Sequence, residues 1–119
     1  MIEGTITRPS TLKLLNALRK TANKNKARIW LDLAERIRKP VRVKKPVNLS
    51  KLNRLYDNKV LVVPSKVLAS GALEKKIEIA AFALSEKARK KIIDKKGTVY
   101  SFYELMEKNP KGSNLVIVG

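Results

Sequence analysis

The basic side chains of this sequence are its richest source of chemistry, because they could bind an anionic partner. Residues 36–54, the basic segment, hold eight cations in nineteen positions without one acid. These cations are Arg36, Arg38, Lys39, Arg42, Lys44, Lys45, Lys51 and Arg54. Patches of a single positive sign are the usual electrostatic footprint of nucleic-acid binding, since Lys and Arg neutralise phosphates and release condensed counterions. The segment therefore predicts a contact surface for nucleic acid.

The charge of the whole chain points to the same class of partner. Its 27 Lys and Arg against 10 Asp and Glu leave a net charge of +17, and residues 1–56 carry 15 of the basic groups but only 3 acids. Such a chain repels itself until a polyanion neutralises it. Two plainer interpretations of the basic segment stay open: a solvated surface run and a nuclear-localisation signal.

Aromatic residues, which would stack on nucleobases, are few. The chain has six, and only Trp30 and Tyr56 fall in its basic first half. We expect Trp30 in the hydrophobic core, because large aromatic side chains are mostly buried, whereas Tyr56 could be a stacking platform or a packed residue. The pattern favours contacts to the phosphates and 2′-hydroxyls of folded RNA over the reading of a single strand base by base.

Catalytic chemistry has little support in this sequence. With no His and no Cys, the usual general base, the commonest metal ligands and the Ser-His and Cys-His arrangements are missing. Asp32 and Glu35 lie at i and i+3 of an expected helix and could serve a carboxylate enzyme, but surface ion pairs explain them better. Neither glycine-containing turn matches a phosphate-binding loop. We expect no enzyme, no metal site, no cofactor, no small-molecule substrate and no membrane span.

The elements that would position the basic segment are mainly helical. Apolar spacing predicts a helix from residue 10 or 11 to 25 and a second from 27 to 38, which Pro40 stops. Residues 39–47 alternate Pro, Val and basic side chains without helical period, so we expect an extended arm. Asn48 can cap a short helix over 49–55.

The second half alternates strands and helices. Residues 60–63 and 66–68 suit a strand that Pro64 confines to an edge or a bend, and 77–84 suit a buried strand. A helix over 85–96 would begin at the Ser85 cap and end with Gly97 at its C-terminal cap, followed by a strand at 98–100. Ser101 and Glu104 form a capping box for the next helix, and 115–118 suit a last strand. This order predicts the α/β class, in one domain: a helical basic region over 1–56 and an α/β core over 57–119.

Four passages of the sequence resemble a known family. They are NKNKARIWLDLAERIRKP (23–40), VNLSKLNR (47–54), VLVVPSKVLASGALEKK (60–76) with ALSEKARKKI (83–92), and EKNPKGSNLVIVG (107–119). Together they resemble the archaeal and eukaryotic eighteen-e family of large-subunit ribosomal proteins, relatives of bacterial ribosomal protein fifteen. The resemblance implies an irregular β-β-α core, an N-terminal region laid against large-subunit ribosomal RNA, neighbouring ribosomal proteins as further partners, a cytoplasmic location on the ribosome, and no catalytic activity.

The resemblance also extends the set of candidate RNA-binding residues. It implies that Asn48 and Ser50 belong to the RNA-facing segment and that Lys66 lies near RNA. The full set is Arg28, Arg36, Arg38, Lys39, Arg42, Lys44, Lys45, Asn48, Ser50, Lys51, Arg54, Tyr56 and Lys66. We expect a structural constituent of the large ribosomal subunit that stabilises folded ribosomal RNA. The alternative is a free basic protein that compacts DNA.

Overall fold

The computed structural model describes residues 8–40 and 44–118 of the 119-residue chain, so Arg42 lies outside the described residues. The helices are α1 (Pro9–Asn25), α2 (Arg28–Arg38), α3 (Leu49–Leu55), α4 (Glu86–Asp94) and α5 (Phe102–Lys108). The strands are β1 (Val47–Asn48), β2 (Val60–Leu68), β3 (Glu78–Leu84), β4 (Thr98–Tyr100) and β5 (Leu115–Ile117). The predicted α/β class with a helical N-terminal extension is confirmed.

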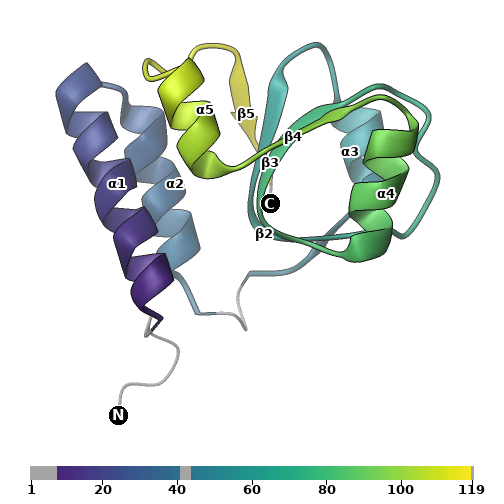
Figure 1. The fold of residues 1–119 in the computed structure, drawn as a ribbon, viewed down its shortest axis with the longest axis horizontal. Coiled ribbons are helices and arrows are strands. Elements are labelled where there is room, and N and C mark those ends of the chain that lie inside the picture. The colour runs from purple at the N-terminus through teal and green to yellow at the C-terminus, as the bar shows by residue number, and fades with distance from the viewer. Residues whose placement is uncertain (1–7, 41–43, 119) are drawn as a thin grey trace.

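The first two helices form an antiparallel hairpin at one side of the molecule (Figure 1). Pro9 occupies the first turn of α1, where its missing N–H costs nothing. The turn between the helices uses Lys26 in the left-handed conformation, with φ of 51°, and the Lys26 N–H donates to the Ala22 carbonyl. Leucines at helical spacing on α1 then pack against the apolar stripe of α2.

Every strand pair in the sheet is parallel. The order is β1-β2-β3-β4, and β5 also pairs with β2. Because β3 covers one edge of β2, the two remaining partners share its other edge: β5 pairs with residues 60–62 and β1 with residues 67–68. The carboxyl ends of the neighbouring strands β2, β3 and β4 therefore meet at one edge of the sheet.

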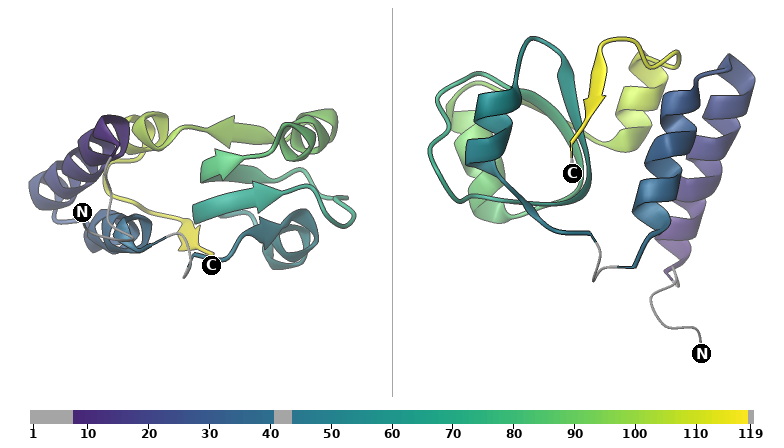
Figure 2. Two further views of the ribbon diagram at one scale, coloured as in Figure 1. Left: turned by 90° about the horizontal axis from the view of Figure 1, so that it is seen from below. Right: turned by 180° about the vertical axis from the view of Figure 1, so that it is seen from behind.

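Helices cover both faces of this sheet, as parallel sheets require (Figures 1 and 2). The α1–α2 hairpin and α5 lie on one face, and α3 and α4 on the other. Alternate residues of β2 separate the two cores, since Val62 packs with the first group of helices whereas Leu61 and Val63 pack with the second. The molecule is thus a sheet between two helical layers.

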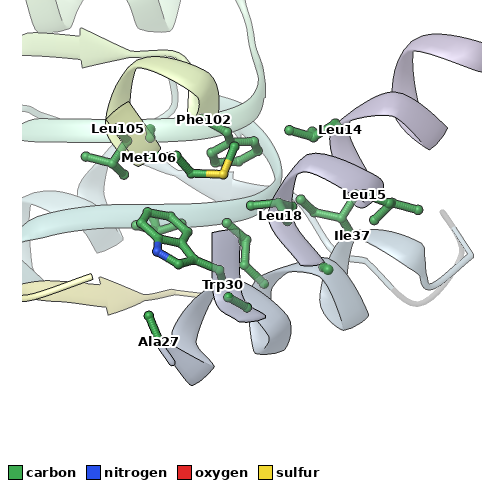
Figure 3. Packing of buried hydrophobic residues seen from close by; sticks show 14 residues of the cluster. Leu14, Leu15, Leu18, Ala27, Trp30, Ile37, Phe102, Leu105 and Met106 are labelled. Carbon is green, nitrogen blue, oxygen red and sulfur yellow. The ribbon is translucent and has the colours of Figure 1, made fainter. Parts of the chain in front are cut away.

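Trp30 anchors the first core, shown in Figure 3 among the leucines of α1 and the side chains of Phe102, Leu105 and Met106. The side chain is fully buried, and its Nε1 donates a hydrogen bond of 2.7 Å to the Pro110 carbonyl. That bond fastens the turn after α5 to α2. The prediction that Trp30 is a core residue is confirmed.

The prediction and the structure differ most at β2, the strand that contains Pro64. β2 is paired on both sides, so it is a central strand and the expectation of an edge is wrong. The expected irregularity is present, because the register with β3 shifts between Val63 and Lys66 and leaves Pro64 and Ser65 out of the pairing. A proline without an N–H is accommodated at such a bulge. The strand predicted at 77–84 is buried only at its beginning, where Ile77, Ile79 and Ala80 lie.

The end of α4 also differs from its prediction. Lys96, not Gly97, adopts the left-handed conformation, with φ of 63°. The Lys96 N–H donates to the Ile93 carbonyl and the Gly97 N–H to the Ile92 carbonyl, which is the paired bonding of a Schellman motif. Gly97 is required for another reason: a Cβ there would lie 2.6 Å from the Ile77 carbonyl oxygen and 2.9 Å from Cγ2 of Ile92.

Replacing Gly97 with Ala should lower the free energy of unfolding by about 1–3 kcal/mol, because the new methyl group overpacks a backbone contact. Replacing Lys96 with Gly, the matched control, should raise it by about 0.5–1 kcal/mol, since glycine tolerates the left-handed conformation. Chemical denaturation of both variants measures the two changes. Equal stability of Gly97→Ala and the wild type would contradict the close packing.

Candidate nucleic-acid interface

The arm between α2 and β1 crosses the carboxyl edge of the sheet. α2 and α3 lie on opposite faces, so the chain changes faces between them, and in Figure 1 the stretch from residue 44 to β1 runs below the lower ends of β2 and β3. Two contacts place it there: β1 pairs with residues 67–68 at the end of β2, and the buried Ser65 hydroxyl donates a hydrogen bond of 3.0 Å to the Lys45 carbonyl. Open α/β sheets bind their ligands outside this edge.

Most of the candidate residues are accessible to a partner. Ten side chains are exposed: Arg28, Arg36, Arg38, Lys39, Lys45, Asn48, Ser50, Lys51, Arg54 and Lys66. Lys44 and Tyr56 are half-buried. Phosphate contacts need exposed cations, so the accessibility of this set is compatible with the predicted role.

Five of the candidates gather where the arm meets the sheet. Arg38 and Lys39 end α2, Lys44 reaches back to the Ile37 carbonyl at 2.9 Å, and Lys45 is tied to Ser65, the neighbour of Lys66. We call Arg38, Lys39, Lys44, Lys45 and Lys66 the carboxyl-edge cluster. It combines residues from a helix, the arm and a strand, and its five members are all cations at the edge where ligands of α/β folds bind.

Other candidates lie away from this cluster. Arg28 begins α2 and Arg38 ends it, which separates them by roughly 15 Å along the axis of the helix. α3 runs toward the opposite, amino edge of the sheet (Figure 1). Arg54 lies in the last turn of α3, and Tyr56 comes directly after the helix. The Tyr56 ring packs against the second core and its hydroxyl lies 3.5 Å from the Glu78 carboxylate. Burial and this carboxylate raise the pKa of Tyr56.

Lys44 has the most constrained environment of the cluster. Its ammonium donates to the carbonyl of Ile37 at the negative end of the α2 dipole and lies 4.8 Å from the centroid of the Phe82 ring. Burial lowers the pKa of Lys44 from its ordinary 10.5. These contacts hold Lys44 in place as the arm crosses the sheet edge.

The acidic pair considered for catalysis has a plain structural explanation. Glu35 forms an ion pair with Arg38 at 3.1 Å, one helical turn away, and both side chains are at least half exposed. Asp32 is exposed on the same helix. The described residues contain no group of His, Cys, Asp and Glu that could hold a metal ion.

Sequence reasoning missed two residues at this edge, Phe82 and Arg89. Phe82 lies in the predicted buried strand, yet its side chain is exposed beside Lys44. Arg89 belongs to the first turns of α4 and lines the same hollow as Phe82. The large aromatic in the otherwise small-residue run Ala80-Ala81-Phe82-Ala83 was the one available signal, because nothing local indicates which strand end the arm will cross.

Comparison with known proteins agrees with the residues that raised the resemblance. The family model described as ribosomal protein 60S L18 and 50S L18e matches residues 9–119. The chain belongs to this family. The L18/L18e match includes both helices of the hairpin, the basic segment and the whole sheet, so the family assignment does not depend on one motif.

Archaeal relatives match over nearly their full length. The large ribosomal subunit protein eL18 of Archaeoglobus fulgidus is 40% identical over 108 residues, covering 90% of this chain and 92% of the relative. That of Methanoregula boonei is 41% identical over 113 residues, covering 94% and 93%. That of Pyrobaculum aerophilum is 46% identical over 111 residues, covering 92% and 91%. Among the residues that the structure describes, no helix is long and apolar enough to cross a membrane.

The pKa of Lys44 in the folded protein should lie below 10.5, because its half-buried ammonium loses hydration. The unfolded chain then binds more protons at alkaline pH, so this residue's contribution to stability rises with pH just below 10.5. NMR titration of the lysine side chains measures the pKa, and the resonance is assigned by its loss in Lys44→Met. A Lys44 resonance that titrates at or above 10.5 would show that loss of hydration does not dominate the pKa of this group.

Proposed function

We propose that this chain is a structural constituent of the large ribosomal subunit that binds and stabilises folded ribosomal RNA through its phosphate backbone. The carboxyl-edge cluster is the main support for the proposal, because it concentrates five cations where the arm crosses the edge of the sheet. The net charge of +17 and relatives named large ribosomal subunit protein eL18 support it. The ribosome would place the chain in the cytoplasm, beside neighbouring ribosomal proteins. No catalytic role is proposed.

The position of each candidate residue determines the part of the RNA contact that it would make. The carboxyl-edge cluster would form the centre of the RNA contact, with Arg42 in the same arm. Asn48, Ser50 and Lys51 at the start of α3 would extend the contact to the second face of the sheet, and Arg28, Arg36 and Arg54 would flank it. Residues 57–119 would supply the α/β framework of one 119-residue domain. Tyr56, which packs at the amino edge, would contribute only at the margin.

Phosphate contact suits these side chains better than base reading. A Lys ammonium is a compact point charge on a flexible stem, which neutralises phosphates without distinguishing bases. Folded RNA offers phosphates and 2′-hydroxyls across its wide minor groove, whereas its base edges in the major groove are out of reach. A single-sign cluster on a rigid sheet edge therefore recognises the shape of folded RNA.

A DNA-compacting protein is the alternative function, and competition separates the two. Duplex DNA and folded large-subunit RNA would compete for the labelled protein at one salt concentration, since affinities compared at different salt have no meaning. Selective retention by the ribosomal RNA supports the proposal. Equal or stronger retention by duplex DNA would favour the alternative.

Neutralising three cluster lysines should weaken RNA binding and flatten its salt dependence. The salt dependence is the slope of log affinity against log salt, which is negative. Its magnitude should decrease by about two to three in the variant that combines Lys39→Gln, Lys45→Gln and Lys66→Gln, because each lysine would neutralise one phosphate. The control combines Lys13→Gln, Lys20→Gln and Lys24→Gln, which removes the same charge from exposed positions of α1. Filter binding at several salt concentrations measures both slopes. Equal slopes for the two triple variants would contradict a contact at the carboxyl-edge cluster.

The native protein in cell extract should sediment with large ribosomal subunits at low salt. Washing the subunits at increasing salt should release it progressively, because each neutralised phosphate adds to the salt dependence. Immunoblotting of gradient fractions measures the distribution. A protein found only in the soluble fractions at low salt would disprove the proposed assembly.

A further inference from the structure

Phe82 is exposed in a place where the fold would normally bury an aromatic side chain. β3 is a central strand, paired with β2 on one side and β4 on the other, and helices cover both faces of the sheet. Even so, 37% of the surface of Phe82 is accessible. The other large apolar side chains exposed among the described residues lie on helices or on β5. The accessible ring therefore needs an explanation beyond ordinary surface composition.

The surroundings of the ring are cationic. The Lys44 ammonium lies 4.8 Å from the ring centroid, and Lys66 pairs in register with Ala83, the residue after Phe82. Lys44 is itself held by the Ile37 carbonyl, so the contact does not depend on a freely moving side chain. An accessible aromatic ring with cations nearby is an arrangement that can bind unstacked nucleotides.

A hollow of about 300 Å³ opens beside the ring, at the carboxyl ends of β3 and β4. Phe82, Leu84, Arg89, Tyr100 and Ser101 contribute to its lining. Within residues 8–40 and 44–118, the Arg89 guanidinium takes part in no hydrogen bond or ion pair. Glu104, the acid of the lining, is engaged by the Ser101 backbone N–H at 2.9 Å in the capping box. The hollow thus joins an apolar ring to an unpaired cation.

We propose that this hollow binds a single unpaired nucleobase of RNA, which stacks on Phe82 while Arg89 neutralises the adjoining phosphate. The inference rests on the proposed function and adds a second kind of contact to it, because the carboxyl-edge cluster binds backbone and Phe82 binds a base. Stacking is tolerant of base identity, since every base has a π-face. The site would therefore recognise that a nucleotide is unpaired at this point of the folded RNA, and not which base it carries.

Charge decides between a nucleobase and an apolar side chain of a partner protein as the occupant. A protein partner would bring an apolar group against Arg89, which lines the hollow, and near Lys44, which contacts the Phe82 ring, so these cations would lose hydration without compensation. A nucleotide brings its own phosphate to these cations and its base to the ring. The Phe82 ring and the cations near it are thus complementary to the base and to the phosphate of a nucleotide.

Substitution of Phe82 tests the stacking contact separately from the backbone contacts. Phe82→Leu keeps apolar volume but loses the aromatic face, and its affinity for a large-subunit RNA fragment should fall about five- to 150-fold. Phe82→Trp should bind within about twofold of the wild type, because tryptophan keeps an aromatic face for the base to stack on. The salt slope of Phe82→Leu should equal that of the wild type, because no charge is removed. Tyr103→Leu, which removes an exposed aromatic from α5, is the control and should not change the affinity.

The possible outcomes separate this inference from the proposed function. Wild-type affinity in a folded Phe82→Leu variant, with the salt slope retained, would overturn base stacking and leave the RNA-binding function standing. Absence of salt-dependent RNA binding by the wild type would overturn the proposed function itself. As an independent measurement, Phe82→p-benzoylphenylalanine should photocrosslink to an unpaired nucleotide in the large subunit. Crosslinking to a protein neighbour or to a base-paired nucleotide would overturn the inference.

Discussion

The parallel pairing of β2 with β3 is the constraint on which the rest of the molecule depends. Parallel strands cannot be joined by tight turns, so longer connections must return the chain: α4 joins β3 to β4, and residues 69–77 join β2 to β3 without a helix. A parallel sheet also needs cover on both faces, which the helices supply. That requirement separates α2 from α3 and obliges the arm between them to pass around an end of the sheet. The basic segment reaches the carboxyl edge for this reason, and the pairing of β1 with the end of β2 holds it there.

Two hydrophobic cores oppose the self-repulsion of a chain that carries a net charge of +17. Apolar residues of β2 pack in both directions, and among the described residues no buried side-chain nitrogen or oxygen lacks a hydrogen-bond partner. The charged groups are held at the surface, where water screens their mutual repulsion. The repulsion between neighbouring cations is thereby kept small in the free protein, and an RNA phosphate that binds between them would lower it further.

Local chemistry allowed much of the fold to be predicted. The Ser85 cap and the Ser101–Glu104 capping box are confirmed because their hydrogen bonds join residues only three apart. The bounds of α3 and the buried state of Trp30 also follow from nearby residues and size. Pro64 was expected at an edge or a bend of the sheet: the register shift beside it confirms the irregularity, whereas the pairing of β2 on both sides rules out the edge. Local sequence could not choose between the two, because strand pairing depends on the partner strands. Gly97 takes part in the cap of α4 through its N–H, as predicted, but the need for a residue without a side chain comes from the distant Ile77 backbone.

The candidate site, like the fold, was predictable from the sequence only in part. By itself the sequence determined the class of partner, the cations of the basic segment and the family, because charge and residue order do not depend on folding. Only the tertiary structure decided that Lys66 and Phe82 lie near the arm and that Arg89 lines the hollow beside Phe82. It also placed Arg28 and Tyr56 away from the carboxyl-edge cluster. The physical reason is that strand register and crossover direction are set by contacts between residues far apart in the chain, and these contacts are not written in any local pattern.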